Sequence, residues 1–133
     1  MLIENYLGCN LNYFSTMTYH ASVERKERIN GILSAVGEFG TVVATIYQEH
    51  LGTCKHLTDM GIIVVTDAWC DRLVTAWIPD ELRPLRQFFM EEDGSPAKSV
   101  PVWMAARVAY AQKKEKQRKQ KRVRYYAEED EAC

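Results

Sequence analysis

Three side chains near the N-terminus could do acid–base chemistry on a phosphate group. On a helix, His20 and Arg28 lie about 80° apart around the axis, and Arg25 lies beyond them on the same side. Histidine titrates near neutral pH, and arginine holds a phosphate through a planar fork of donors. Cleavage of RNA by its own 2′-hydroxyl needs a base, an acid and cationic donors for the transition state. These three residues are of the kinds that this reaction uses.

The same segment also has a simpler interpretation. A single histidine followed by the charged run Glu24 to Arg28 is typical of a solvated helix with ion pairs between neighbouring turns. On these residues alone, the solvated helix is favoured over a catalytic site.

The elements that would position His20 follow from capping residues and hydrophobic periodicity. Thr16 or Thr18 can cap a helix over residues 18–29, and Asn30-Gly31 interrupts it. An apolar stripe at i, i+3, i+4 and i+7 predicts a second helical piece that faces a core and stops at a glycine. The stripe consists of Ile29, Ile32, Leu33 and Val36, and the stop is Gly37 or Gly40.

The next part of the chain changes to the composition of strands. Residues 41–48, 60–67 and 72–78 are rich in β-branched side chains, and the last two segments are close enough for an antiparallel hairpin. A long polar loop is expected over residues 49–61. Alternation places Leu73, Thr75 and Trp77 on one face of the last strand, and Val74, Ala76 and Ile78 on the other. The predicted class is α+β, with the helices packed on one face of a small antiparallel sheet over residues 1–95.

A helical extension over residues 96–133 follows this domain. Asp80 is expected to start a short helical piece that Pro84 limits, and residues 91–99 form a polar loop. Pro101 suits the first position of a long helix over residues 101–122. Its first half has a small apolar face made of Val102, Ala105, Ala106 and Ala109. The second half has no apolar face, so we expect it to project into solvent or to contact a polyanion.

Charge is segregated along the chain, although the formal net charge is only −1. Residues 1–106 contain 8 Lys and Arg against 13 Asp and Glu, and residues 125–133 contain none against 4. Residues 107–124 contain 9 against 1. The long helix is therefore strongly basic, between an acidic body and an acidic tip.

The basic helix predicts a nucleic-acid contact, because cations that neutralise phosphates release condensed counterions. Tyr110, Tyr125 and Tyr126 could stack on unpaired bases. The expected contact residues are Lys113, Lys114, Lys116, Arg118, Lys119, Lys121, Arg122 and Arg124. Two alternatives remain open: a solvated tail on which the acidic tip folds back, and a docking helix for an acidic protein. A membrane contact is not expected, because the basic half has no apolar face.

The composition predicts a cytoplasmic protein without cofactors. The chain has 47% hydrophobic and 26% charged residues, ordinary globular values, and neither a run long enough to span a bilayer nor a signal-like start. Four cysteines, at positions 9, 54, 70 and 133, match no disulfide framework, so reduced thiols are expected. His50, Cys54 and His56 resemble a metal cluster but lack a fourth ligand, and no metal is expected.

Residues 18–78 resemble the small ribonuclease toxins of the RelE, barnase, EndoU and colicin superfamily. The resemblance rests on His20-Ala21 with Arg25 and Arg28 in the first helix, and on the hairpin I-I-V-V-T-D and L-V-T-A-W that ends with Thr75 and Trp77. It implies helices before a curved antiparallel sheet, with the active site on the exposed sheet face beside the first helix. It further implies His20 as general acid or base, Arg25 or Arg28 as phosphate clamp and Thr75 as a donor to the scissile phosphate. Trp77 would pack or stack beside them, although a core position is favoured for it.

These observations together predict an RNA-directed protein, and specifically a metal-independent endoribonuclease of toxin type. RNA is preferred to DNA because the implied mechanism uses the 2′-hydroxyl. An antitoxin or a host protein is the other expected partner. The alternative is a non-catalytic protein of a phage or mobile element that uses the same scaffold and basic helix to bind nucleic acid or a host complex.

Overall fold

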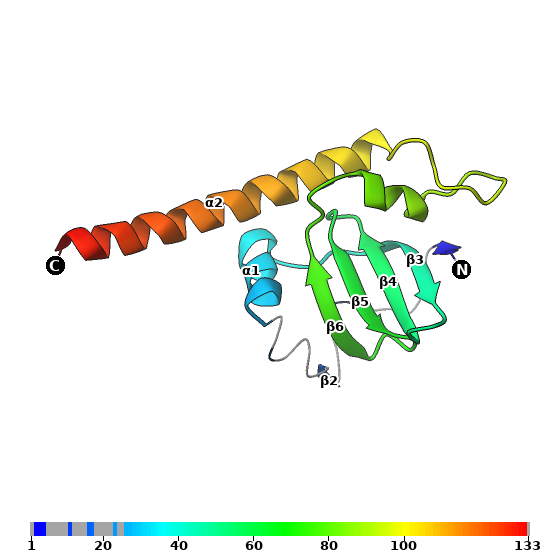
Figure 1. Cartoon of the computed structure of the whole chain (residues 1–133), viewed down its shortest axis with the longest axis horizontal. Coiled ribbons are helices and arrows are strands. Elements are labelled where there is room, and N and C mark those ends of the chain that lie inside the picture. The colour runs from blue at the N-terminus through cyan, green and yellow to red at the C-terminus, as the bar shows by residue number, and fades with distance from the viewer. Residues whose placement is uncertain (1, 5–10, 12–15, 18–22, 24–25, 133) are drawn as a thin grey trace.

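The computed structural model describes residues 2–4, 11, 16–17, 23 and 26–132, and the side chains of residues 11, 23 and 26–120. The strands are β1 (Leu2–Glu4), β2 (Thr16–Met17), β3 (Val42–Gln48), β4 (Thr53–Thr58), β5 (Ile63–Asp67) and β6 (Arg72–Trp77). The helices are α1 (Lys26–Val36), the 3₁₀ helix η2 (Arg83–Phe88) and α2 (Val102–Ala132). The α+β class with an antiparallel sheet and a C-terminal helix is confirmed (Figure 1).

The sheet has the order β1-β3-β4-β5-β6-β2. Its centre is the antiparallel meander β3 to β6, while β1 pairs antiparallel with β3 at one edge and β2 pairs parallel with β6 at the other. Gly52 and Gly61 have φ of +64° and +76° in the loops that follow β3 and β4. Such left-handed backbone favours glycine, which has no Cβ, and allows these reversals to be short.

The loop predicted over residues 49–61 is wrong, because β4 occupies its middle. His56 pairs with Thr45 of β3 on one side and with Val64 of β5 on the other. The strand is central in the meander, yet its sequence TCKHLT has one large aliphatic side chain. His56 is stabilised by hydrogen bonds to side chains of β3 and β5, and the Thr58 hydroxyl accepts hydrogen bonds from the N–H groups of Met60 and Ile62. A hydropathy pattern does not reveal such partners.

The interruption predicted at Asn30-Gly31 does not occur, because α1 continues through both residues. Gly31 is buried, and a Cβ at this position would lie 3.0 Å from Nη1 of Arg118 in α2. The glycine therefore permits close approach of the two helices instead of breaking one of them. The helix ends before Gly37, whose N–H donates to the carbonyl of Leu33 (2.8 Å) at a φ of +87°. The predicted helix over residues 18–25 falls largely outside the described residues.

The side chains of β6 do not alternate along the whole strand as predicted, because the strand contains a bulge. Thr66 pairs with Leu73 and Val65 with Thr75, so Val74 is an extra residue on β6. Leu73 consequently faces α1, on the same side of the sheet as Ala76. It was predicted to share a face with Thr75. Thr75 stays on the opposite face, as predicted, together with Trp77.

Two apolar cores lie on opposite faces of the sheet. One forms between α1 and the sheet, and its buried members include Ile29, Ile32, Phe39, Val64, Leu73 and Ala76. The other is covered by η2 and the start of α2, and contains Ala44, Leu57, Ile63, Leu85, Phe88, Met104 and Val108. Helix α2 crosses the end of the sheet above both cores and then extends past the body (Figure 1).

The long helix predicted over residues 101–122 begins at Val102, directly after Pro101, and continues to Ala132. The apolar face predicted for its first half is wrong. Met104, Val108 and Ala111 are buried, whereas Val102 is 86% exposed. Spacings of four and three residues place the buried three on one stripe. Arg118 is half-buried against α1, so the second half of the helix also docks as far as this residue.

Cys70 is disulfide-bonded, with a partner outside the described residues, so the expectation of reduced thiols is wrong there. Cys54 is a free, buried thiol, and its burial, together with the charge of Asp67, raises its pKa. Because disulfides are rare in cytosolic proteins, this bond does not support the predicted cytoplasmic location, which stays a prediction. Among the described residues, no helix combines the length and apolar character needed to cross a bilayer.

Candidate nucleic-acid interface

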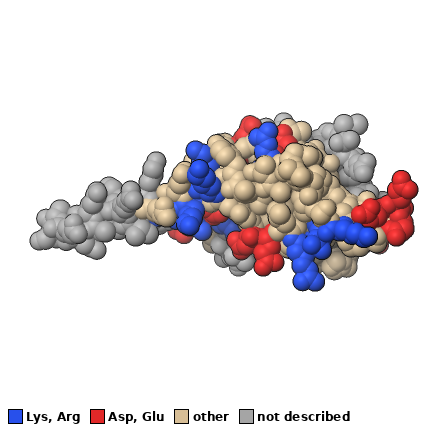
Figure 2. Space-filling model, turned by 90° about the horizontal axis from the view of Figure 1, so that it is seen from above, with Lys and Arg blue, Asp and Glu red and all other residues tan. Residues whose placement is uncertain are grey.

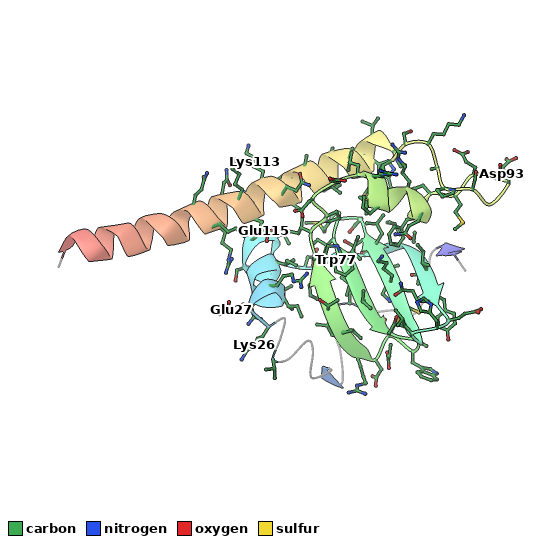
Figure 3. The ribbon with its side chains drawn as sticks, in the orientation of Figure 1. Lys26, Glu27, Trp77, Asp93, Lys113 and Glu115 are labelled. Carbon is green, nitrogen blue, oxygen red and sulfur yellow. The ribbon has the colours of Figure 1, made fainter. Side chains whose placement is uncertain are left out.

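The side of α2 that faces away from the sheet presents lysines to solvent. Lys113, Lys116 and Lys119 are exposed, and Figure 3 shows Lys113 on the side opposite to α1. Seen from above, the described part of α2 carries a group of blue side chains (Figure 2). Lys113 and Lys116 define this outer surface, which follows from which stripe the core has buried. Lys119, eleven residues or about three turns after Val108, is exposed on the continuation of the buried stripe.

A second line of residues, exposed except for the half-buried Lys114, runs along one flank of α2 and mixes aromatic with basic side chains. It consists of Trp103, Arg107, Tyr110 and Lys114, at successive spacings of four, three and four residues. Trp103 and Tyr110 are each 48% exposed. The Lys114 ammonium lies 5.4 Å from the centre of the Tyr110 ring, a cation–π contact. We call these four residues the aromatic flank.

Negative charge does little to balance this surface. Between residues 102 and 120, Glu115 is the only acidic residue, and its carboxylate pairs with Lys119 at 3.4 Å. Ion pairs at the surface are weak and screened by salt. Helix α2 therefore keeps an excess of positive charge along its exposed sides.

The predicted contact residues do not all have the same position. Lys113, Lys116 and Lys119 are exposed and Lys114 is half-buried in the aromatic flank, whereas Arg118 packs over Gly31 of α1. The side chains of Lys121, Arg122 and Arg124, as well as Tyr125 and Tyr126, lie outside the described side chains. Among the predicted contact residues with described side chains, Arg118 therefore packs between α1 and α2.

The face of the sheet opposite α1 carries the second group of predicted residues. Trp77 lies at the end of β6 below η2, and the ammonium of Lys55 is 5.7 Å from its ring centre (Figure 3). A hollow of about 290 Å³ lies beside this pair, lined also by Ile63, Pro79, Asp80, Glu81 and Pro84. The Thr75 hydroxyl on the same face is buried and has no hydrogen-bond partner among the described residues.

The described residues do not bring the candidate catalytic groups together. His20 and Arg25 lie outside them. Arg28 is half-buried on α1, which packs on the face opposite Thr75. The first-helix motif of the ribonuclease toxins that residues 18–78 resemble is H-A-x-x-R, with two residues between alanine and arginine. In this chain three residues separate Ala21 from Arg25, so the match is not exact. The carried-over active site therefore stays a prediction.

The histidine that sequence reasoning placed in a loop is part of a buried network. His56 is 0% exposed, and its Nδ1 and Nε2 atoms form 2.8 Å hydrogen bonds with the hydroxyls of Thr45 and Thr66. The Thr66 hydroxyl donates to the carbonyl of Asp67, which suits a neutral ring with its proton on Nε2. Burial lowers the pKa of His56 to about 4. This histidine has a structural role, because both ring nitrogens are already occupied.

The other members of the predicted metal cluster are separated from it. His50 is exposed in the turn after β3, whereas Cys54 is buried on β4. Over the part of the chain that the structure describes, no three His, Cys, Asp or Glu side chains gather as metal ligands.

Sequence reasoning overlooked Trp103 and Arg107, although their spacing to Tyr110 and Lys114 is visible in the sequence. They were missed because the predicted apolar face of the helix was the wrong one. The aromatic flank is recognised only once the buried stripe of α2 is known. No protein-family model matches the chain, and no curated protein or solved structure shows a significant match to it.

Proposed function

We propose that this protein binds RNA through the exposed surface of α2, including the aromatic flank. The observation that supports this most directly is the packing of α2. Its buried stripe of Met104, Val108 and Ala111 leaves basic and aromatic side chains exposed along the rest of the helix.

Basic and aromatic groups in one line suit a single strand with unpaired bases. Lysines and arginines neutralise phosphates, while aromatic rings stack on bases regardless of their identity. Trp103 and Lys114 are eleven residues apart, which corresponds to about 16 Å along a helix. A surface of this length can contact several nucleotides of one strand.

Replacing Lys113 and Lys116 with glutamine is expected to weaken RNA binding on the order of tenfold or more at low salt. Both side chains are exposed, so the fold should not change. Binding of a fluorescent single-stranded RNA, followed by anisotropy over a range of salt concentrations, gives the affinity and its salt dependence. The slope of log K against log salt should become shallower by about 1.4, since each lost contact to a single strand removes about 0.7.

The matched control replaces two exposed cations away from α2, Lys26→Gln with Arg72→Gln. This control has the same loss of charge and should keep nearly the original affinity and slope. Trp103→Ala with Tyr110→Ala should weaken binding while the slope stays the same, because stacking releases no counterions. Equal losses in the α2 charge variant and the control would show that only net charge matters and would contradict the proposed interface.

The second proposal is that the protein cleaves RNA as a metal-independent endoribonuclease. It is favoured by the buried hydroxyl of Thr75, which has no hydrogen-bond partner in the described part of the chain and lies on a sheet face that also carries Lys55 and Trp77. A buried hydroxyl without a partner is costly unless a ligand satisfies it, which is common at functional sites.

Cleavage is tested with purified protein and total RNA in excess EDTA. The proposal expects fragments with 2′,3′-cyclic phosphate ends, and a rate that falls about a hundredfold or more in His20→Ala, because acid–base catalysis contributes this much. Thr75→Val should also slow the reaction, whereas His50→Ala is the matched control, because His50 is exposed in a turn on another part of the sheet. RNA that is bound but stays intact would overturn the nuclease proposal and favour the non-catalytic alternative.

A further inference from the structure

We infer that a cleft between η2 and residues 96–98 binds the phosphate group of a ligand the size of a nucleotide. The cleft has a volume of about 610 Å³. Its lining residues are Arg83, Pro84, Arg86, Gln87, Pro96, Ala97 and Lys98. It is separate from the α2 surface discussed above and does not depend on the RNA-binding proposal.

The two arginines are placed side by side by the type of helix that carries them. Side chains three residues apart eclipse in a 3₁₀ helix, so Arg83 and Arg86 project from one face of η2. Lys98 lines the opposite wall, and all three cations are exposed to solvent. Two guanidinium groups and one ammonium group around the same cleft are hydrogen-bond donors of the kinds that bind phosphate.

The backbone that carries these cations is held on both walls. Leu85 and Phe88 anchor η2, because both side chains are buried in the core. On the other wall, the N–H of Ala97 donates to the carbonyl of Arg86 (3.3 Å), and Ala97 itself is buried. The walls are therefore preformed, which reduces the entropy lost on binding.

The loop that precedes residues 96–98 is held by hydrogen bonds between its own residues. The Asp93 carboxylate accepts hydrogen bonds from the N–H (2.9 Å) and hydroxyl (2.6 Å) of Ser95, and these bonds lower the pKa of Asp93. The N–H of Glu91 donates to the carbonyl of Ser95 at 2.8 Å. The turn just before Pro96 is thus defined by local bonds, and it uses the Asp93 carboxylate within the loop.

Charge and size together indicate the class of ligand. None of the lining residues is acidic, and Figure 2 shows a group of blue side chains at the end of the molecule that carries η2, apart from the group on α2. The volume lies within the range of small-molecule sites and exceeds what a bare phosphate needs. Pro84, Pro96 and Ala97 offer apolar contacts for a sugar or base. A nucleoside monophosphate fits this combination, either free or as the 5′-phosphorylated end of an RNA strand.

Calorimetric titration with adenosine 5′-monophosphate and with adenosine tests the inference on the full chain. The monophosphate is expected to bind at least tenfold more tightly than adenosine, because the phosphate forms the charge-assisted bonds. Arg83→Gln with Arg86→Gln should weaken monophosphate binding tenfold or more. Lys26→Gln with Arg72→Gln removes the same charge from exposed positions elsewhere and should leave it unchanged.

Equal binding of adenosine and the monophosphate, binding of neither, or an unchanged affinity in the double arginine variant would each overturn the inference. RNA with a 5′-phosphate, compared with 5′-hydroxyl RNA of the same sequence, separates the two sources of the phosphate. A preference for phosphorylated RNA that disappears in the double arginine variant assigns the cleft to a strand end, and no preference assigns it to free nucleotides. Lys113→Gln with Lys116→Gln should not affect monophosphate binding, so the α2 proposal and this one can fail independently.

Discussion

Replacing Gly61 with alanine is expected to lower the free energy of unfolding by roughly 2 to 5 kcal/mol, from backbone strain together with overpacking. Gly61 has a φ of +76°, where an L side chain is strained. A Cβ there would also lie 2.8 Å from the backbone nitrogen and 2.9 Å from the Cα of Val108 in α2. Since backbone atoms of a packed helix cannot rotate aside, either the loop after β4 or α2 must move.

Gly52→Ala is the matched control for this substitution. Gly52 has a similar φ of +64°, but a Cβ there would meet no atom within 4 Å. Its cost should be limited to the conformational strain, about 1 to 2 kcal/mol. Urea unfolding of both variants measures the difference. Equal destabilisation would mean that the contact between α2 and the loop after β4 is not tight.

The stability of the protein is expected to fall by about 3 kcal/mol between pH 6.5 and pH 4 through His56 alone. Burial lowers the pKa of this histidine to about 4, from an ordinary value of 6.5. Between these two values the unfolded chain binds the proton and the folded chain does not. Acid therefore favours the unfolded state, and the loss is complete below the folded pKa.

Substitution of His56 by glutamine isolates this contribution. The variant should be less stable at neutral pH, because the network with Thr45 and Thr66 is disrupted. Its stability should nevertheless depend less on pH, by the equivalent of one proton between pH 6.5 and 4. His50→Gln removes an exposed histidine and should keep the original profile. A His56→Gln profile parallel to that of the unsubstituted protein would show that another group causes the acid sensitivity.

The strands with mainly apolar and β-branched residues could be predicted from the sequence, and β4 could not. Residues 42–48, 63–67 and 72–77 agree with the predicted segments, since burial on both faces produces runs of aliphatic side chains. In β4 the buried positions include Cys54 and His56, which resemble a polar loop or a metal cluster. The burial of His56 depends on partners from other strands, Thr45 and Thr66, which no local sequence pattern indicates.

The candidate sites show the same division. The basic segment 107–124 is visible in the sequence, because charge counts need no coordinates. The cleft formed by Arg83, Arg86 and Lys98 is not visible in the sequence, because eleven residues separate Arg86 from Lys98. The turn at Asp93 and the hydrogen bond from the Ala97 N–H to the Arg86 carbonyl bring the two walls together.

The sequence by itself determined the α+β class, the start of the long helix after Pro101 and the concentration of positive charge in it. These properties depend on composition, local periodicity and the fixed φ of proline, which act over a few residues. Tertiary structure alone decided which side of α2 is buried. Alanines occur on several sides of its first half, and the docking of Met104 and Val108 onto the end of the sheet selects one of them. The exposed aromatic flank follows from that selection, because a side chain is available to a ligand only where the core has not already buried it.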